Sequence, residues 1–420
     1  MKLNLLTVML LGSGLFLTAC GGNDDKGGNS STNTNVNADV NNIQNPVAST
    51  PVAYEYKQDY PPNAAESVVM TYKMQGIKGQ ETQATALVFT PRTAPPAGGW
   101  PIVAWAHGTV GVGDDCAPSR NRLIVEGLLP DVHTQKMIDS FVQEGYVVVA
   151  PDYEGLGEPS GEELHPFLNL KSEAYSITDA VVATKSWLGN KASNKWAVVG
   201  ASQGGHAALG AAQYAARANM DYKGVVAFAP ANNLEMIESL SDMALADRRF
   251  AAQLLGYSVL DTLTAYMAAG MKSAYPTEPV YSIVFKSPTD KIAEKAESEC
   301  ILDMANSMSN PMLDYFFAKG NLKDYPRKNA GYTQHPIVRQ FLDKDLPPLQ
   351  TLIKTPIIIY QGDKDVIVLP RATDALVAQA RALTTKIDYR KGPDWDHLTV
   401  FKDNVENGQL LEDIKTLLAN

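Results

Sequence analysis

The residue best placed to act as a nucleophile is Ser202, in the pentapeptide Gly200–Gly204, which fits the pattern G-x-S-x-G. Five small residues can arise by chance, so the surroundings matter: the apolar stretch WAVVG leads in and the helical pattern GGHAALGAAQYAARA leads out. A sharp strand-to-helix turn needs small neighbours, and it exposes the serine hydroxyl beside a helix N-terminus, which stabilises developing negative charge. Covalent attack on an acyl group is the chemistry this favours, and a structural serine in such a turn is the alternative.

A serine hydroxyl needs a base to take its proton, and the base needs an acid to orient it. Where the nucleophile lies in a strand-to-helix turn, the acid and then the base follow it along the chain. The segment Gln361–Val368 follows the last long apolar run and places Asp365 in a G-x-x-D turn, with Asp363 as the alternative acid. His397, in a loop before the terminal helical pattern, is the expected base.

The remaining histidines are expected to be structural, apart from one that belongs to a motif. His206 lies one turn past Ser202 and is expected to pack or hydrogen-bond near the site. Asp394 and Asp396 flank His397 and either tune its pKa or, the more common case, are solvated loop carboxylates. Three histidines lie in polar or proline-flanked loops: His133, His165 and His335.

The motif with the fifth histidine is Ala106–Thr109 (AHGT), directly after the apolar run PIVAWA. In folds with such a serine turn, the loop after this strand supplies one amide of the oxyanion hole, and the residue after the nucleophile supplies the other. This assigns the backbone N–H of Gln203 and that of Thr109, with Gly108 as the alternative to Thr109.

Apolar runs alternate with helical patterns along most of the chain, which predicts an α/β fold with a mostly parallel central sheet flanked by helices. Two early strands, at residues 67–74 and 82–90, are expected to be antiparallel. Continuous Val/Ile runs suit strands buried on both faces, and they fall at residues 101–106, 146–151, 196–200, 224–230 and 356–360. Helical patterns fall at residues 134–144, 172–188, 204–218, 372–384 and 409–418.

Between Pro230 and Pro356 the alternation stops, and a mostly helical pattern replaces it. A structureless loop of this length is implausible in a compact domain, so we expect an inserted helical cap at about residues 232–350. This stretch holds seven of the 13 methionines of the chain. Methionine is flexible and could line an adaptable acyl pocket, although methionines at helical spacing more often form plain core.

The N-terminus indicates export. Lys2 and the short apolar stretch 5–17 are typical of a signal peptide at residues 1–19, too short for a permanent membrane span. The following Leu17–Gly22 (LTACGG) resembles a bacterial lipobox, which implies acylation of Cys20 and anchoring in the cell envelope, at the outer membrane, facing the periplasm or at the cell surface. An ordinary signal peptide is the alternative. Residues 20–50 are rich in Asn, Gly and Ser and predict a flexible linker before a folded domain at residues 51–420.

The net charge bears on possible binding partners, and the cysteine content bears on a possible disulfide. The formal net charge is −10 with no block of Lys or Arg, which argues against nucleic acid as a partner. Of the three cysteines, Cys116 and Cys300 remain if Cys20 is lipidated. In an exported protein these two are expected to pair, and two buried free thiols are the alternative. We expect a monomer.

With these residues in view, the chain resembles the secretory lipase / carboxylesterase branch of the α/β-hydrolases. The stretches that carry the resemblance are HGTVGVGDDCAPS at 107–119, APDYEGLGEPSGEELHPFL at 150–168, VVGASQGGHAAL at 198–209 and QGDKDVIV at 361–368. The resemblance implies that the DYEGLG segment borders the active site and that a helical cap precedes the acid. The chain departs from the family in the Glu-rich run 158–163 and in its lipobox. Because of these departures, the resemblance does not identify the size of the substrate or the physiological role.

The sequence therefore predicts a serine hydrolase that cleaves carboxylic esters through an acyl-enzyme on Ser202. This chemistry requires no metal or organic cofactor, and the sequence has no H-E-x-x-H or Cys-x-x-Cys motif. The same triad also serves serine peptidases, thioesterases and polymer-active esterases, which are the alternatives. A non-catalytic surface-binding lipoprotein would be expected to have lost part of the triad.

Overall fold

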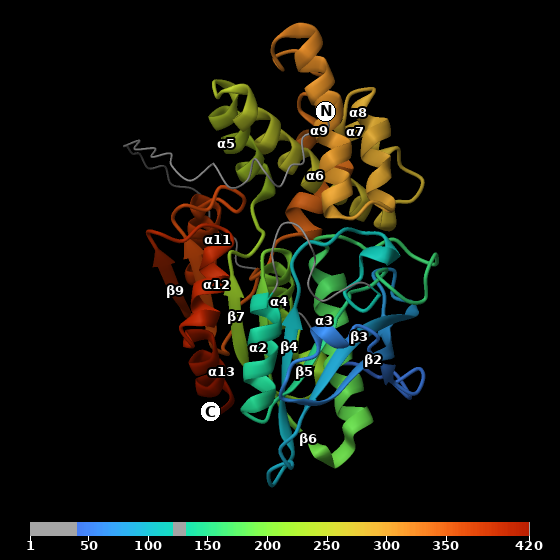
Figure 1. Cartoon of the computed structure of the whole chain (residues 1–420), viewed down its shortest axis with the longest axis vertical. Helices are drawn as coiled ribbons and strands as arrows, with labels where there is room; N and C mark the ends of the chain where they lie inside the picture. Colours follow the sequence, from blue (N-terminus) through green and yellow to red (C-terminus); the bar gives the residue numbers. More distant parts are fainter. Residues whose placement is uncertain (1–39, 121–131, 420) are drawn as a thin grey trace.

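The computed structural model describes residues 40–120 and 132–419, which form a nine-stranded sheet with helices on both faces and a helical cap at one end (Figure 1). The strand order is β1-β2-β3-β5-β4-β6-β7-β8-β9, antiparallel from β1 to β5 and parallel from β5 to β9. This confirms the mostly parallel α/β sheet. The strands are β1 (Val52–Ala53), β2 (Ala64–Gln75), β3 (Glu81–Pro91), β4 (Trp100–Ala106), β5 (Val147–Pro151), β6 (Ala192–Ala201), β7 (Asp221–Phe228), β8 (Ile357–Gly362) and β9 (Ile387–Gly392).

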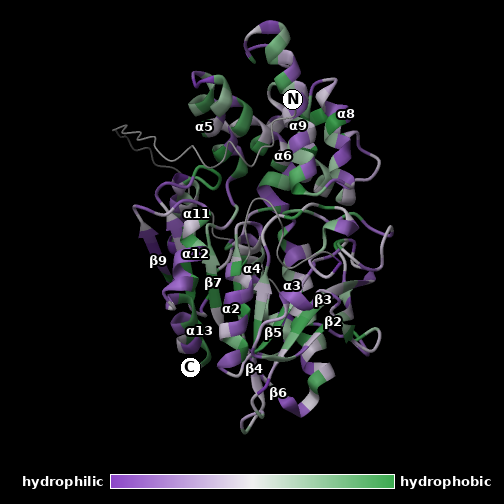
Figure 2. Ribbon diagram, viewed as in Figure 1, coloured by the Kyte–Doolittle hydropathy of each residue, from purple (hydrophilic) through white to green (hydrophobic). Residues whose placement is uncertain are grey.

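Successive side chains of the central strands point into two separate cores, one on each face of the sheet. In β4, Ile102 and Ala104 belong to one core, whereas Val103 and Trp105 belong to the other. This explains why the runs are apolar at every position. Figure 2 shows hydrophobic colouring along these strands. The first core is covered by α3 (Leu170–Leu188), α4 (Gln203–Gln213) and α11 (Pro370–Ala382), the second by α2 (Val132–Gln143), α12 (Thr399–Glu406) and α13 (Gln409–Ala419).

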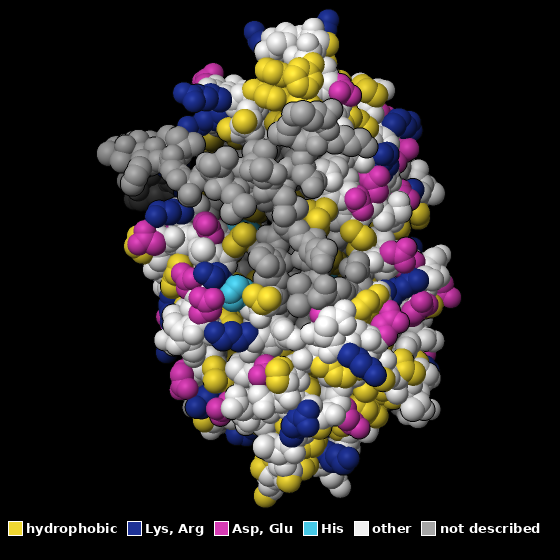
Figure 3. Space-filling view, viewed as in Figure 1, with side chains coloured by type: hydrophobic (Ala, Val, Ile, Leu, Met, Phe, Trp, Pro, Cys, Tyr) yellow, Lys and Arg dark blue, Asp and Glu magenta, His cyan; other side chains and the backbone are white. Residues whose placement is uncertain are grey.

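Between β7 and β8 the chain forms a helical cap with its own apolar core (Figure 1). Five of the cap methionines are buried, which agrees with a role in the core, whereas Met243 is 73% exposed. Figure 3 shows hydrophobic side chains gathered near the tip of the cap. In α9, Phe317 is 76% exposed. The helices are α5 (Leu234–Ala246), α6 (Phe250–Ala274), α7 (Val280–Val284), α8 (Thr289–Ala293), α9 (Ile301–Lys319) and α10 (Pro336–Gln340), followed by a π-helical turn (Phe341–Asp345).

The N-terminal linker is shorter than the sequence predicts. Asn41 donates from its side chain to Asp179, and Val47 forms a β-bridge with Tyr72 in β2. The boundary expected at residue 50 is therefore wrong, because residues from about 41 onward already bind to the folded body. The expected signal peptide and Cys20 lie outside the described residues. Within residues 40–120 and 132–419, no helix combines the length and apolar character needed to cross a bilayer.

Three elements were absent from the sequence-based prediction. β9 lies at the sheet edge, and only its two end residues, Ile387 and Gly392, are buried, so it lacks a continuous apolar run. α12 and β1 were missed because they are short. The helix expected at 204–218 ends at Gln213, and the chain continues as a 3₁₀ turn. The 3₁₀ helices are η1 (Lys57–Asp59), η2 (Asp114–Cys116), η3 (Gly189–Lys191), η4 (Ala215–Ala218), η5 (Glu294–Glu297) and η6 (Tyr332–Gln334).

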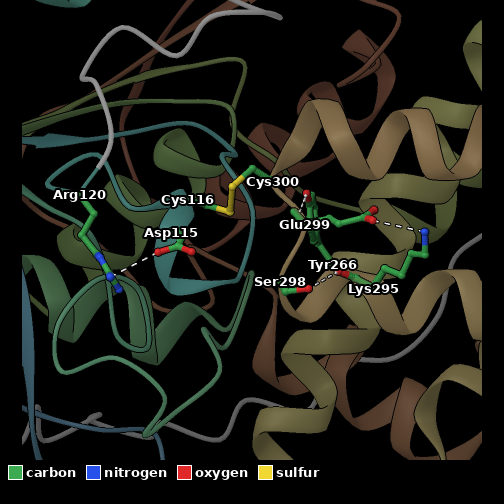
Figure 4. The surroundings of a disulfide bond; sticks show 8 residues. All are labelled: Asp115, Cys116, Arg120, Tyr266, Lys295, Ser298, Glu299 and Cys300. Carbon is green, nitrogen blue, oxygen red and sulfur yellow. Dashed lines mark hydrogen bonds and ion pairs between the residues drawn. A yellow bond between two sulfur atoms is a disulfide. The ribbon is translucent and has the colours of Figure 1, made fainter. Parts of the chain in front are cut away.

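A disulfide between Cys116 and Cys300 joins the loop after β4 to the cap (Figure 4). Beside it, the backbone N–H of Ile301 donates to the carbonyl of Val110 at 2.9 Å. On the other side, Arg120 lies 3.4 Å from Asp115 and forms an ion pair with it. The start of α9 is therefore bound, covalently and by a main-chain hydrogen bond, to the segment that follows the AHGT motif.

Candidate active site

Ser202 lies between the end of β6 and the start of α4, with φ 58° and ψ −119°. Backbone crowding explains its glycine neighbours: a Cβ on Gly200 would lie 2.0 Å from the carbonyl oxygen of Gly204, and one on Gly204 would lie 1.9 Å from that of Ala106. Only glycine fits at both positions. The backbone therefore turns sharply at Ser202, and its side chain lines a pocket beneath the cap.

Three of the predicted site residues lie within hydrogen-bonding distance of one another. His397 Nε2 is 3.0 Å from Ser202 Oγ, and His397 Nδ1 is 2.8 Å from Asp365 Oδ2. In this arrangement Nδ1–H donates to the carboxylate, and Nε2 is free to accept the serine proton. Asp363, the alternative acid, instead forms an ion pair with Lys391 at 3.1 Å.

Asp365 follows β8 and is held as an acceptor in the turn predicted from G-x-x-D. Its Oδ1 accepts the backbone N–H groups of Ile367 and Val368, each at 2.9 Å, and Gln361 Nε2 lies 3.2 Å from Oδ2. The residue is only 2% exposed. A buried carboxylate with this many donors is held in one orientation, which in turn fixes the ring of His397.

His397 lies between β9 and α12, in a turn organised by Asp396. The carboxylate of Asp396 accepts the backbone N–H groups of Leu398 and Thr399. Burial disfavours the charged form of His397, but the charge and hydrogen bond of Asp365, together with the charge of Asp396, outweigh burial and raise the pKa of His397 above its usual value. Asp394 behaves differently, because it is 87% exposed and forms an ion pair with Lys364.

The AHGT loop lies directly against the serine turn. A Cβ built on Gly108 would be 3.5 Å from the carbonyl oxygen of Ala201, and Thr109 lines the same pocket as Ser202 and Gln203. His107 supports the loop from within: burial lowers the pKa of its ring, and its backbone carbonyl accepts the hydroxyl of Tyr153 at 2.9 Å. The residues expected to form the oxyanion hole are thus adjacent to Ser202.

The pocket extends from Ser202 into the cap, and its wall is mostly apolar. Two cap helices, α5 and α6, contribute eight of the nineteen lining residues, and Ile367 and Val368, which follow Asp365, also line the pocket. The apolar lining residues are Phe167, Leu168, Ala231, Leu234, Ile237, Leu260, Leu263, Met267, Leu342, Ile367 and Val368. An elongated apolar group attached to a carbonyl at Ser202 matches this lining.

Two further residues near Ser202 were not identified from the sequence. Glu173, fully buried at the start of α3, contacts both Gln203 and His206. His165, expected to be structural, lies 2.9 Å from Gln203 Nε2. Glu173 lies outside the motifs, and His165 lies in the stretch 150–168 without a predicted role, so only their buried positions in the fold reveal their contacts with Gln203.

Comparison with known proteins identifies the family and the fold of the chain. A sequence profile of the secretory lipase family matches residues 129–404. Candida antarctica lipase A in its closed state is similar in structure, with a TM-score of 0.64, 18% identity and coverage of 87% of this chain and 83% of the lipase. The rice cell wall degrading esterase LipA from Xanthomonas oryzae is also similar, with a TM-score of 0.59, 20% identity and coverage of 84% and 89%.

These structural similarities establish the fold, and the sequence profile establishes the family. No match to a curated protein was found at the sequence level. The profile spans both the serine turn and the His397 loop, and it extends over the whole cap. The chain therefore belongs to the secretory lipase family and is a carboxylic ester hydrolase.

Proposed function

We propose that Ser202, Asp365 and His397 form a catalytic triad that hydrolyses carboxylic esters through an acyl-enzyme. The observation that carries this proposal is the hydrogen-bonded series from Ser202 Oγ to His397 at 3.0 Å and from His397 to Asp365 at 2.8 Å. Nucleophile, base and orienting acid are the three parts that acyl transfer needs.

In the first half of the reaction, His397 Nε2 takes the hydroxyl proton while Ser202 Oγ attacks the ester carbonyl. The backbone N–H groups of Gln203 and Thr109, with Gly108 as the alternative to Thr109, donate to the oxyanion. The imidazolium then protonates the departing alcohol, and Ser202 retains the acyl group. A water molecule, deprotonated by His397, releases the acid and restores the serine hydroxyl.

The pocket favours an aliphatic acyl group. Its wall includes leucine, isoleucine and methionine side chains of α5 and α6, and the lining is mostly apolar although Glu235, Glu238 and Thr264 also contribute to it. Burying an acyl methylene contributes about 0.8 kcal/mol, so each additional carbon that the pocket accommodates strengthens binding. A peptide segment would instead bury amide groups without partners, which disfavours the peptidase alternative.

Membership of the secretory lipase family agrees with export. We further propose that Cys20 is lipidated and anchors the catalytic domain to the cell envelope. This domain includes the cap at about residues 232–350. Two or three acyl chains are sufficient for stable anchoring. Mass spectrometry of the mature protein from a lipoprotein-processing host is expected to show Cys20 as the acylated first residue. A mature N-terminus at another position, or an unmodified Cys20, would contradict the anchor.

Replacing the nucleophile tests the triad. Ser202→Ala is expected to lower kcat for a p-nitrophenyl ester by at least about 10⁴-fold, because no oxygen remains to form the acyl-enzyme. The wild type should also show a burst of nitrophenol equal to its active sites, and a fluorophosphonate should add its mass to Ser202. Substantial turnover by Ser202→Ala, with the folded state verified by circular dichroism, would refute the mechanism.

The raised pKa of His397 predicts the pH profile. Neutral His397 is required as the base, so kcat/KM is expected to fall as the pH drops through a value above that of an ordinary histidine. Asp396→Asn removes a negative charge that favours the imidazolium but keeps an oxygen for Leu398 and Thr399, so the acidic limb should move to lower pH. Asp394→Asn, exposed and paired with Lys364, is the control and should leave the limb in place.

The acyl pocket predicts how chain-length preference can be changed. Leu263→Trp fills the wall contributed by α6, so kcat/KM for octanoate esters should fall by about tenfold or more while acetate esters change by less than about twofold. The control is Leu352→Trp, since Leu352 is 46% exposed and does not line the pocket. Equal effects of Leu263→Trp on both esters would place the acyl group elsewhere.

A further inference from the structure

The side chain of Gln203 enters a buried polar cluster that the reaction described above does not use. Gln203 is 1% exposed, and its Nε2 lies 2.9 Å from Glu173 Oε1 and 2.9 Å from His165 Nε2. Its partner Glu173 also contacts His206 one turn further along α4. We refer to Glu173, His165, Gln203 and His206 as the Glu173 cluster.

Glu173 is the centre of the cluster because its carboxylate accepts from three groups, two on α4 and one on the segment before α3. Oε1 accepts the side chain of Gln203 and, at 3.1 Å, the backbone N–H of Leu168; Oε2 lies 2.6 Å from His206 Nδ1. Leu168 lines the substrate pocket and has a positive φ of 57°. One buried carboxylate therefore holds the residue after the nucleophile and a turn of the pocket wall.

His206 extends the cluster into the cap. Its Nε2 lies 2.7 Å from the carbonyl oxygen of Leu346, and its Nδ1 faces Glu173. A carbonyl and a carboxylate are both acceptors, so each ring nitrogen of His206 faces an acceptor. Leu346 follows the π-helical turn that contributes Leu342 to the pocket, so His206 joins the start of α4 to the end of the cap.

His165 completes the set as a neutral acceptor. Its Nδ1 lies 2.8 Å from the carbonyl oxygen of Glu154 and donates to it, which leaves Nε2 to accept from Gln203. Burial lowers the pKa of His165 to about 4, so the ring stays uncharged at neutral pH. Both side-chain N–H groups of Gln203 thus have fixed acceptors.

We propose that Glu173 is a positioning residue for ester hydrolysis: with His165 and His206, it fixes Gln203 so that the backbone N–H of Gln203 is directed at the oxyanion. The inference rests on the proposed acyl-enzyme function of Ser202. A donor that binds the oxyanion acts in the transition state, so displacing it lowers kcat and leaves KM nearly unchanged. Displacement by about 1 Å is enough to cost about 10²-fold in rate.

Two substitutions of Glu173 distinguish an effect on the position of Gln203 from an effect on the stability of the whole protein. Glu173→Ala removes the acceptor for all three donors, and kcat is expected to fall by about 10- to 100-fold with KM changed by less than about threefold. Glu173→Gln keeps an oxygen for Leu168 and Gln203, and its amide can donate to a neutral His206, so kcat should stay within about threefold of the wild type. The affinity of an alkyl boronic acid, which forms a tetrahedral adduct on serine, should follow kcat.

Asp179 offers a matched control on the same helix. It is also fully buried, but it pairs with Arg217 at 2.8 Å and has no contact with the Glu173 cluster among the described hydrogen bonds. Asp179→Ala should lower the unfolding temperature while kcat, measured below that temperature, stays near the wild-type value. If Glu173→Ala does not fold, Glu173→Asp, which withdraws the carboxylate by one methylene, should still lower kcat and boronic acid affinity together.

The inference is overturned if Glu173→Ala, or Glu173→Asp in its place, retains wild-type kcat and boronic acid affinity. It is also overturned if Asp179→Ala loses kcat by the same factor, since the effect would then be one of general stability. Failure of the underlying function looks different: Ser202→Ala would remain active. An inactive Ser202→Ala with a normal Glu173→Ala refutes only the positioning role.

Discussion

Close packing of backbone against backbone at the serine turn is the constraint on which the rest of the site depends. With Gly200 and Gly204 in contact with neighbouring main chain, β6 can pass directly into α4, and Ser202 takes a positive φ that costs a non-glycine residue about 1–3 kcal/mol. Neighbouring strands offset this cost: the N–H of Ser202 donates to Phe228 at 2.9 Å, and its carbonyl accepts from Ala231 at 3.0 Å. The nucleophile is therefore held by the sheet itself.

The other parts of the site reach Ser202 because parallel strands end at the same edge. The AHGT loop follows β4, Asp365 follows β8 and His397 follows β9, so loops at one edge of the sheet supply the residues of the proposed active site. The cap covers this edge, and charged groups help to fix its inner packing: Arg327 binds Asp261 at 2.6 Å, and Lys328 binds Glu238 at 2.9 Å. A methionine-rich core alone would pack less specifically than one combined with such pairs.

Much of this arrangement could be predicted from the sequence, because strands buried on both faces of a parallel sheet appear as continuous apolar runs. The apolar runs predicted the positions of β4 to β8, and the long stretch without such a run predicted the position of the cap. The order of motifs along the chain predicted the residues that the structure brings together around Ser202. Edge strand β9 was missed because its exposed face takes polar residues, and the linker boundary was wrong because polar residues such as Asn41 bind the body through hydrogen bonds. Glu173 could not be found, since a glutamate in a helical pattern looks solvent-exposed until the fold buries it.

The bond between Cys116 and Cys300 divides the chain into a covalent ring, an N-terminal tail that contains β1 to β4, and a C-terminal tail. Residues 117–299 lie within the ring and include the serine turn, β5 to β7 and all of α6, whereas Asp365 and His397 belong to the C-terminal tail. Completing the proposed triad therefore depends on non-covalent docking of β8 and β9 beside the ring. Local opening of that C-terminal segment would remove acid and base together and leave a nucleophile that is folded but unactivated.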